Sequence, residues 1–247
     1  MSLILGILLL ILLFGGLTLW FFIMPRLSGG ADLSLLKKNY AHRGLWNEKI
    51  PQGSLDAMLL ASRVGYGVKL EVYLSRDRRL MVVGREKTTL PLSLVLATLD
   101  GATPVMIEIG GKKTNLGLCL RLARMLDAYG GAFSIISRNP KMLAYFKDYR
   151  PSFARGQIIT SASDFSTAHL LQNYRSRPDF LVLEKTVHRR PTLLIFTKLC
   201  HLPCFVDRID TQEDYLACRR QKQYAIFTKI RPKDRPKKRR PNEQFYI

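Results

Sequence analysis

The chain has 247 residues, of which 47% are hydrophobic, and its 39 lysines and arginines against 19 acidic residues give a net charge of +20. This length and apolar content can bury a core in one large domain or two small ones, which excludes a disordered polyelectrolyte. The four cysteines are too few and too irregularly spaced for a small disulfide-stabilised scaffold.

Residues 1–24 predict a transmembrane anchor. No side chain from Ser2 to Met24 is charged. As a helix rising about 1.5 Å per residue, this segment spans about 34 Å, more than the hydrocarbon core of about 30 Å. A cleaved signal peptide would carry a basic residue ahead of the apolar run and a good cleavage site after it, and a buried core helix would have a polar face. The segment has none of these features.

The residues that flank this segment predict its orientation. No Lys or Arg precedes it, whereas Arg26, Lys37, Lys38 and Arg43 follow it. Because basic flanks stay in the cytoplasm, we expect a single-pass protein of the cell membrane whose large domain is cytoplasmic. Four unpaired cysteines agree with that reducing compartment. Residues 25–38 would form the juxtamembrane linker.

Residues 39–229 alternate short apolar runs with stretches of helical period, which predicts β-α units and a parallel sheet. The eight predicted strands are residues 40–41, 68–74, 105–109, 133–136, 157–159, 180–183, 204–206 and 225–228. The predicted helices are residues 55–64, 116–126, 141–146 and 214–218. Eight such units predict an α/β fold, a shortened (β/α)8 barrel of the TIM type. A further apolar run at residues 80–83 predicts a hairpin with the second strand.

Residues 230–247 are predicted to form a basic tail. Eight lysines and arginines lie in residues 229–240, and Pro232 and Pro236 prevent a continuous helix there. Beside a membrane such a tail attracts anionic lipid headgroups. Nucleic acid is a less suitable partner because the tail lacks interleaved aromatic residues that stack on bases. A basic surface without any dedicated partner is the third explanation.

Short motifs at the predicted strand ends resemble those of the glycerophosphodiester phosphodiesterase family. They are Tyr-Ala-His-Arg-Gly at 40–44, Pro-Gln-Gly-Ser-Leu at 51–55, Gly-Tyr-Gly-Val-Lys-Leu-Glu-Val at 65–72, Ile-Glu-Ile-Gly at 107–110, and the segments 134–140 and 225–229. Each motif is modest alone, but their order covers residues 39–229. The resemblance implies a (β/α)8 barrel with its active site at the C-terminal ends of the strands.

The resemblance also implies a set of site residues. The family uses two histidines as general acid and base, an arginine that holds the phosphate, and three carboxylates that bind Ca²⁺ or Mg²⁺. His42 and Arg43 match the first histidine and the arginine, and Glu71 and Glu108 match two of the metal carboxylates. Lys69 stands at the position of the remaining carboxylate.

The chain departs from the family pattern in charge. Gly84 stands where the second histidine is expected, and Arg85 where its acidic neighbour is expected. With the phosphate-binding candidates Arg43, Lys69 and Arg85 against Glu71 and Glu108, the site carries +1 instead of a negative charge. Because an ammonium repels a cation, we expect no metal ion or other cofactor, and we expect Lys69 to take the metal's place beside both carboxylates. Loss of one acid-base group alone slows catalysis about 10²–10⁴-fold.

These observations leave three functions open. The first is a catalytically degenerate, membrane-anchored member of the family that binds a phosphate-bearing headgroup or glycerophosphodiester and acts in regulation of lipid or glycerophosphodiester metabolism. The second is a weak phosphodiester hydrolase that uses His42. The third is a structural membrane protein that contacts anionic surfaces. The sequence identifies no protein partner.

Two further features predict no site. Cys200, His201 and Cys204 lack the second ligand pair of a zinc site, so we expect buried, reduced thiols. His169 and His188 belong to no motif and are expected on the surface or in helices.

Overall fold

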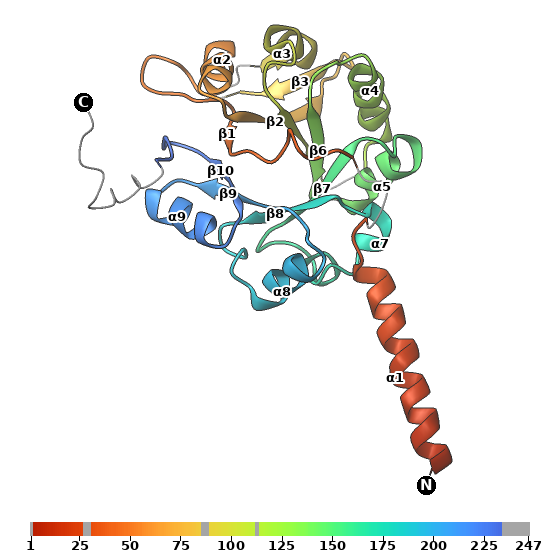
Figure 1. The fold of residues 1–247 in the computed structure, drawn as a ribbon. Helices are drawn as coiled ribbons and strands as arrows, with labels where there is room; N and C mark the ends of the chain where they lie inside the picture. The colour runs from red at the N-terminus through yellow and green to blue at the C-terminus, as the bar shows by residue number, and fades with distance from the viewer. Residues whose placement is uncertain (1, 27–30, 85–88, 112–113, 234–247) are drawn as a thin grey trace, which may run out of the picture.

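The computed structural model describes residues 2–26, 31–84, 89–111 and 114–233. Arg85 and the tail from residue 234 onward therefore lie outside the described residues. In the described part, ten strands form one sheet, and eight of them close into a parallel barrel in the order β1-β10-β9-β8-β7-β6-β5-β2, with β1 paired to β2 (Figure 1). The predicted barrel is confirmed.

The strands agree closely with the predicted runs. They are β1 (Tyr40–His42), β2 (Gly67–Leu74), β3 (Leu80–Val83), β4 (Thr89–Pro91), β5 (Val105–Ile109), β6 (Phe133–Ser137), β7 (Ala154–Ile159), β8 (Phe180–Glu184), β9 (Cys204–Ile209) and β10 (Tyr224–Phe227). The run at residues 80–83 pairs antiparallel with β2 as predicted, and β4 extends this hairpin by a short third strand that was not predicted.

Helices α2 to α9 connect these strands. The helices are α1 (Ser2–Ile23), α2 (Leu55–Arg63), α3 (Leu92–Leu99), α4 (Leu116–Asp127), α5 (Pro140–Tyr149), α6 (Phe165–Ala168), α7 (Asn173–Ser176), α8 (Pro191–Leu199) and α9 (Gln212–Arg220). Five of them begin at a polar side chain that accepts a backbone N–H of the first turn, which stabilises that end of a helix. These capping residues are Ser54, Asn115, Asn139, Asp164 and Thr211.

The parallel barrel has two chemically different ends. The C-terminal ends of the eight strands surround one opening, which we call the mouth, and the segments that enter the strands form the opposite end, which we call the base. Apolar side chains fill the barrel wall and the space beneath the helices in three clusters, which support both ends of the barrel. The family motifs of His42, Glu71 and Glu108 all lie towards the mouth.

The predicted N-terminal anchor is a single straight helix. Helix α1 leaves the barrel beside α7 and projects away from it (Figure 1). Its residues Leu3–Ile23 are long and apolar enough to cross a membrane, and that window is not buried against the rest of the chain. Membrane anchors and N-terminal signal sequences share this length and composition.

Candidate functional site

Lys69 lies at the centre of the mouth. It is on β2, and its side chain is only 1% exposed. The Nζ atom lies 2.6 Å from Oδ2 of Asp207 on β9 and 3.0 Å from Oε2 of Glu108 on β5. One buried ammonium therefore pairs with two carboxylates from strands on different sides of the barrel.

Lys69 and Asp207 keep their charges although they are buried. Burial acts to lower the pKa of Lys69, but the charges and hydrogen bonds of Asp207 and Glu108 outweigh it, so the pKa is raised. Burial likewise acts to raise the pKa of Asp207, but the ammonium lowers it overall. At neutral pH Lys69 and Asp207 therefore form a pair of one ammonium and one carboxylate.

The donor set at the mouth does not fit the divalent cation that the resemblance implies. A hard cation needs several oxygen ligands converging on one point. Here the Lys69 ammonium lies between the two carboxylates, and an Arg43 nitrogen lies 2.8 Å from Oε2 of Glu71. Within the described residues, no three His, Cys, Asp or Glu side chains are arranged to hold a metal.

The pairing of Glu71 corrects one expectation from the sequence. Glu71 was expected to share Lys69 with Glu108, but it bonds Arg43 instead. The reason is the backbone at Arg43, which has a φ of 58°, a left-handed conformation uncommon outside glycine. Arg43 N–H donates to the Lys69 carbonyl, and Gly53 N–H donates to the Arg43 carbonyl, which holds this turn in place.

His42 is a neutral imidazole beside the lysine. It ends β1 directly opposite Lys69 in the β1–β2 register. Burial, and next the charge of Lys69, lower the pKa of His42 to about 4. Its Nδ1 atom is buried and has no hydrogen-bond partner in the described part of the chain. A histidine in this state is neutral at pH 7 and is a weak proton acceptor.

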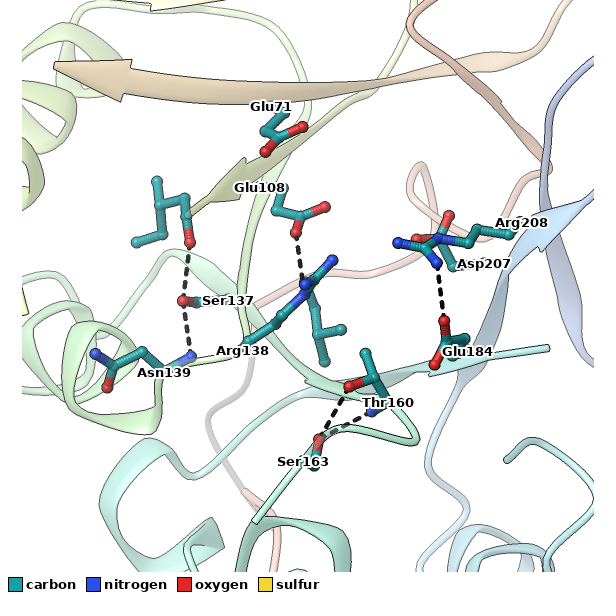
Figure 2. A network of polar contacts seen from close by, with 12 residues as sticks. Glu71, Glu108, Ser137, Arg138, Asn139, Thr160, Ser163, Glu184, Asp207 and Arg208 are labelled. Carbon is teal, nitrogen blue, oxygen red and sulfur yellow. Dashed lines mark hydrogen bonds and ion pairs between the residues drawn. The ribbon is translucent and has the colours of Figure 1, made fainter. Parts of the chain in front are cut away.

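Two arginines that the sequence analysis did not select also lie at the mouth. Arg138, at the end of β6, has its Nε 3.6 Å from Oε1 of Glu108, and Arg208, on β9, has Nη1 2.9 Å from Oε1 of Glu184. Their side chains are 56% and 61% exposed, and Figure 2 shows the two guanidinium groups directed towards each other. Each keeps N–H groups available for a ligand.

Hydrogen bonds from serine residues fix the loops around these arginines. The Ser137 hydroxyl donates to the Ile109 carbonyl and accepts the Asn139 N–H, on either side of Arg138 (Figure 2). The N–H and hydroxyl of Ser161 both donate to Glu184. The acidic partner of Arg208 is thereby held in position.

Sequence reasoning missed Asp207, Glu184, Arg138 and Arg208. Every one of these residues is a charged residue at or just after the end of an apolar strand, and that signal was available. Counted over the described residues, the cations Arg43, Lys69, Arg138 and Arg208 balance four acids, Glu71, Glu108, Glu184 and Asp207. The charges of these eight side chains sum to zero, whereas the predicted +1 depended partly on Arg85, which lies outside the described residues.

The other histidines and cysteines supply no second acid-base group or metal site in the described structure. His201 lies at the base, and His169 is exposed as expected. His188 was expected on the surface or in a helix but is buried in the turn after β8, where Nδ1 lies 2.6 Å from the Lys185 carbonyl oxygen. The four cysteines are unpaired, and three are buried. Gly84 follows β3 and offers no side chain to the mouth.

Comparison with solved structures identifies the fold. A glycerophosphodiester phosphodiesterase from Parabacteroides distasonis is similar with a TM-score of 0.65 and 17% identity, covering 77% of this chain and 92% of that one. One from Agrobacterium tumefaciens has a TM-score of 0.60 and 19% identity over 77% and 95%. The chain has the glycerophosphodiester phosphodiesterase fold. An Oleispira antarctica phosphodiesterase, solved with the product sn-glycerol-3-phosphate, has a TM-score of 0.59 and 18% identity over 77% and 92%.

The likeness to glycerophosphodiester phosphodiesterases lies in the fold rather than in the overall sequence. No family model matches the sequence, and comparison with curated proteins gives no match. Short strand-end motifs carry the resemblance, while the surrounding residues have diverged.

Proposed function

We propose that this chain is a degenerate, membrane-anchored member of the glycerophosphodiester phosphodiesterase family that binds phosphate-bearing glycerol compounds without a metal ion. One observation carries the proposal: the Lys69 ammonium lies within 3.0 Å of both Glu108 and Asp207. It supplies the positive charge that a divalent cation supplies in the family. The carboxylates then hold the lysine and are no longer free to bind a metal.

The arginines at the mouth support phosphate recognition. Guanidinium groups offer several N–H donors in a planar array that suits phosphate oxygens. Arg138 and Arg208 are half-exposed, and each makes one ion pair in the described structure. The Oleispira antarctica phosphodiesterase of the same fold was solved with sn-glycerol-3-phosphate, a ligand of this chemical class.

Calorimetry of the full-length protein in detergent, with sn-glycerol-3-phosphate as ligand, tests this proposal. We expect binding in EDTA that Ca²⁺ does not strengthen. Arg138→Gln and Arg208→Gln should each weaken it about tenfold or more, since a hydrogen bond to a charged group contributes about 1.5–3 kcal/mol. Arg150→Gln is the matched control, because Arg150 also pairs with an acid, Asp127, but lies at the base.

Two results would contradict the proposal. One is binding that requires Ca²⁺ or Mg²⁺. The other is an equal loss of affinity in Arg150→Gln, which would show that general charge rather than the mouth holds the ligand.

A slow hydrolase is the second candidate, favoured by the state of His42. Its imidazole is neutral at pH 7 and has an unpaired Nδ1, so it is available as a general base, but a pKa of about 4 makes it a weak base and the turnover slow. Release of glycerol phosphate from glycerophosphocholine would distinguish the candidates. Turnover above about 1 s⁻¹, in the range of ordinary enzymes, and lost in His42→Gln, would favour the hydrolase. Turnover near background would favour the binding protein.

A further inference from the structure

A second basic site lies at the base of the barrel, at the opposite end from the mouth. It is a groove of about 780 Å³ between the residues that enter β1, β9 and β10. Its basic lining residues are Lys37, Lys198, His201, Arg220 and Lys222. We call it the base groove.

No acidic side chain in the described lining of the base groove neutralises its basic side chains. None of its lining residues is acidic, and no ion pair involves Lys37, Lys198, Arg220 or Lys222 in the described structure. Hydrogen bonds from Ser34 lower the pKa of the Asp32 carboxyl, and the positive charge of Lys37 lowers it by a smaller amount. The arginines at the mouth, in contrast, each face a carboxylate.

The base also holds the end of helix α1. Arg177 Nη1 donates to the carbonyls of Phe21 and Met24 at 3.1 and 2.8 Å, and Asn173 Nδ2 donates to that of Ile23 at 2.7 Å. The ring of Phe22 meets Tyr174 edge-on at 4.9 Å. These contacts satisfy carbonyls that a helix end otherwise leaves unpaired.

The helix end and the base groove share one apolar cluster. Ile23 packs against a group of buried residues that includes Leu202 and Cys204, and both of these line the groove. Helix α8, which supplies Lys198, contributes Leu193 and Phe196 to the same cluster. The groove and the end of the apolar helix therefore lie at the same end of the barrel and share one apolar cluster.

We infer that the base groove binds the phosphate of an anionic phospholipid headgroup in the membrane that α1 enters. This inference rests on the membrane anchor of the proposed function. Ammonium, guanidinium and imidazole groups are donors that phosphate oxygens accept. An anionic membrane surface attracts each nearby basic residue enough to change affinity about fivefold. The mouth, at the other end of the barrel, then faces the aqueous phase and binds a dissolved ligand.

The tail is a weaker candidate for this lipid contact than the base groove. Its described start, residues 229–233, follows the C-terminal end of β10 at the mouth, where the side chain of Gln212, at the start of α9, donates to the Lys233 carbonyl. It therefore leaves the barrel at the end opposite to the α1 contacts.

The test uses the full-length protein in detergent, with short-chain phosphatidylglycerol, phosphatidylcholine and inorganic phosphate as probes. We expect phosphatidylglycerol to protect residues 198–204 and 219–224 from hydrogen exchange. Neutralising Lys198→Gln, Arg220→Gln and Lys222→Gln together should weaken its binding about 100-fold. All three side chains are exposed, so the variant should fold, and Lys198→Arg with Lys222→Arg should retain binding.

A matched control comes from a different basic groove. Arg78, Arg121 and Arg124 line a groove beside α4 and the β2–β3 turn, and changing all three to Gln removes the same number of charges. This control variant should bind phosphatidylglycerol normally.

Three outcomes would overturn the inference: equal weakening in the control variant, equal binding of phosphatidylcholine, or equal protection by inorganic phosphate. Failure of the proposed function is a separate result. Arg138→Gln and Arg208→Gln should each weaken glycerol phosphate binding at the mouth about tenfold or more and leave phosphatidylglycerol binding at the base groove unchanged.

Discussion

At the scale of single residues, position 69 decides what the mouth can bind. A carboxylate there would join Glu108 and Asp207 as a third oxygen ligand, whereas Lys69 binds those two carboxylates itself. Once the ammonium is buried, removing it leaves two carboxylates without a counter-charge, which costs far more than the ion pairs contribute.

Lys69→Met should therefore lower the free energy of unfolding by about 3–5 kcal/mol, which is the cost of removing one partner of a buried ion pair. Lys185→Met is the matched control. Lys185 also lies between two carboxylates, 2.9 Å from Asp210 and 2.6 Å from Asp214, but its side chain is 36% exposed. The control should lose about 1 kcal/mol or less, because water screens exposed pairs.

Urea unfolding of the full-length protein in detergent measures both losses. Equal losses in Lys69→Met and Lys185→Met would contradict the account of a buried, charged cluster at the mouth.

The protonation of His42 gives a second test at this scale. Its pKa is lowered to about 4, below the value near 6.5 of an unfolded chain. The unfolded state therefore binds more protons between these values, so His42 should reduce stability as the pH falls from about 6.5 to 4. An NMR titration, with His42 assigned by its absence in His42→Gln, should show a midpoint near pH 4. A midpoint at 6.5 or above would mean that the ring is solvated or paired with a carboxylate.

At the scale of elements, hydrophobic patterns in the sequence predicted the barrel strands, the β2–β3 hairpin and five of the helices: α1, α2, α4, α5 and α9. Helices α3 and α8 were missed because they are apolar on most faces, so their period is weak. The link between β7 and β8 is irregular as well, with two four-residue helices in place of one long one.

The site was less predictable than the fold. Barrel closure brings Asp207 to Lys69 across 138 positions of sequence, and no local pattern encodes that contact. Glu71 pairs with Arg43 instead of Lys69, and this pairing depends on the left-handed backbone conformation of Arg43. Motif positions identified His42, Arg43, Lys69, Glu71 and Glu108, but not how their charges pair.

Helix α1 gives the prediction at the element scale. Deleting residues 2–19 removes the exposed apolar span and keeps Phe21 to Met24, which contact the barrel. The deleted form should then be released from the membrane fraction at about 1 M salt. At that concentration the Debye length is about 3 Å, so attraction between basic residues and anionic lipids is screened. An unrelated apolar helix of equal length in place of residues 2–19 should restore retention. Membrane retention of the deleted form at high salt would contradict anchoring by α1, and a mature N-terminus beyond residue 26 would identify a signal sequence.

At the scale of the whole molecule, the two ends of the barrel are proposed to do different work. The base carries the end of helix α1 and the base groove, and the mouth carries the Lys69 cluster with Arg43, Arg138 and Arg208. This division allows a protein held at a membrane to keep its ligand site open to water.

The response to divalent cations tests the central claim, that Lys69 takes the place of a metal ion, most directly. Thermal melting of the full-length protein should be the same in EDTA, Ca²⁺ and Mg²⁺. Lys69→Glu should melt lower in EDTA, because it brings a third carboxylate to Glu108 and Asp207 without an ammonium, and Ca²⁺ should raise its melting temperature by binding the folded state. A Ca²⁺-dependent rise in the unsubstituted protein that is lost in Glu108→Gln would contradict the account.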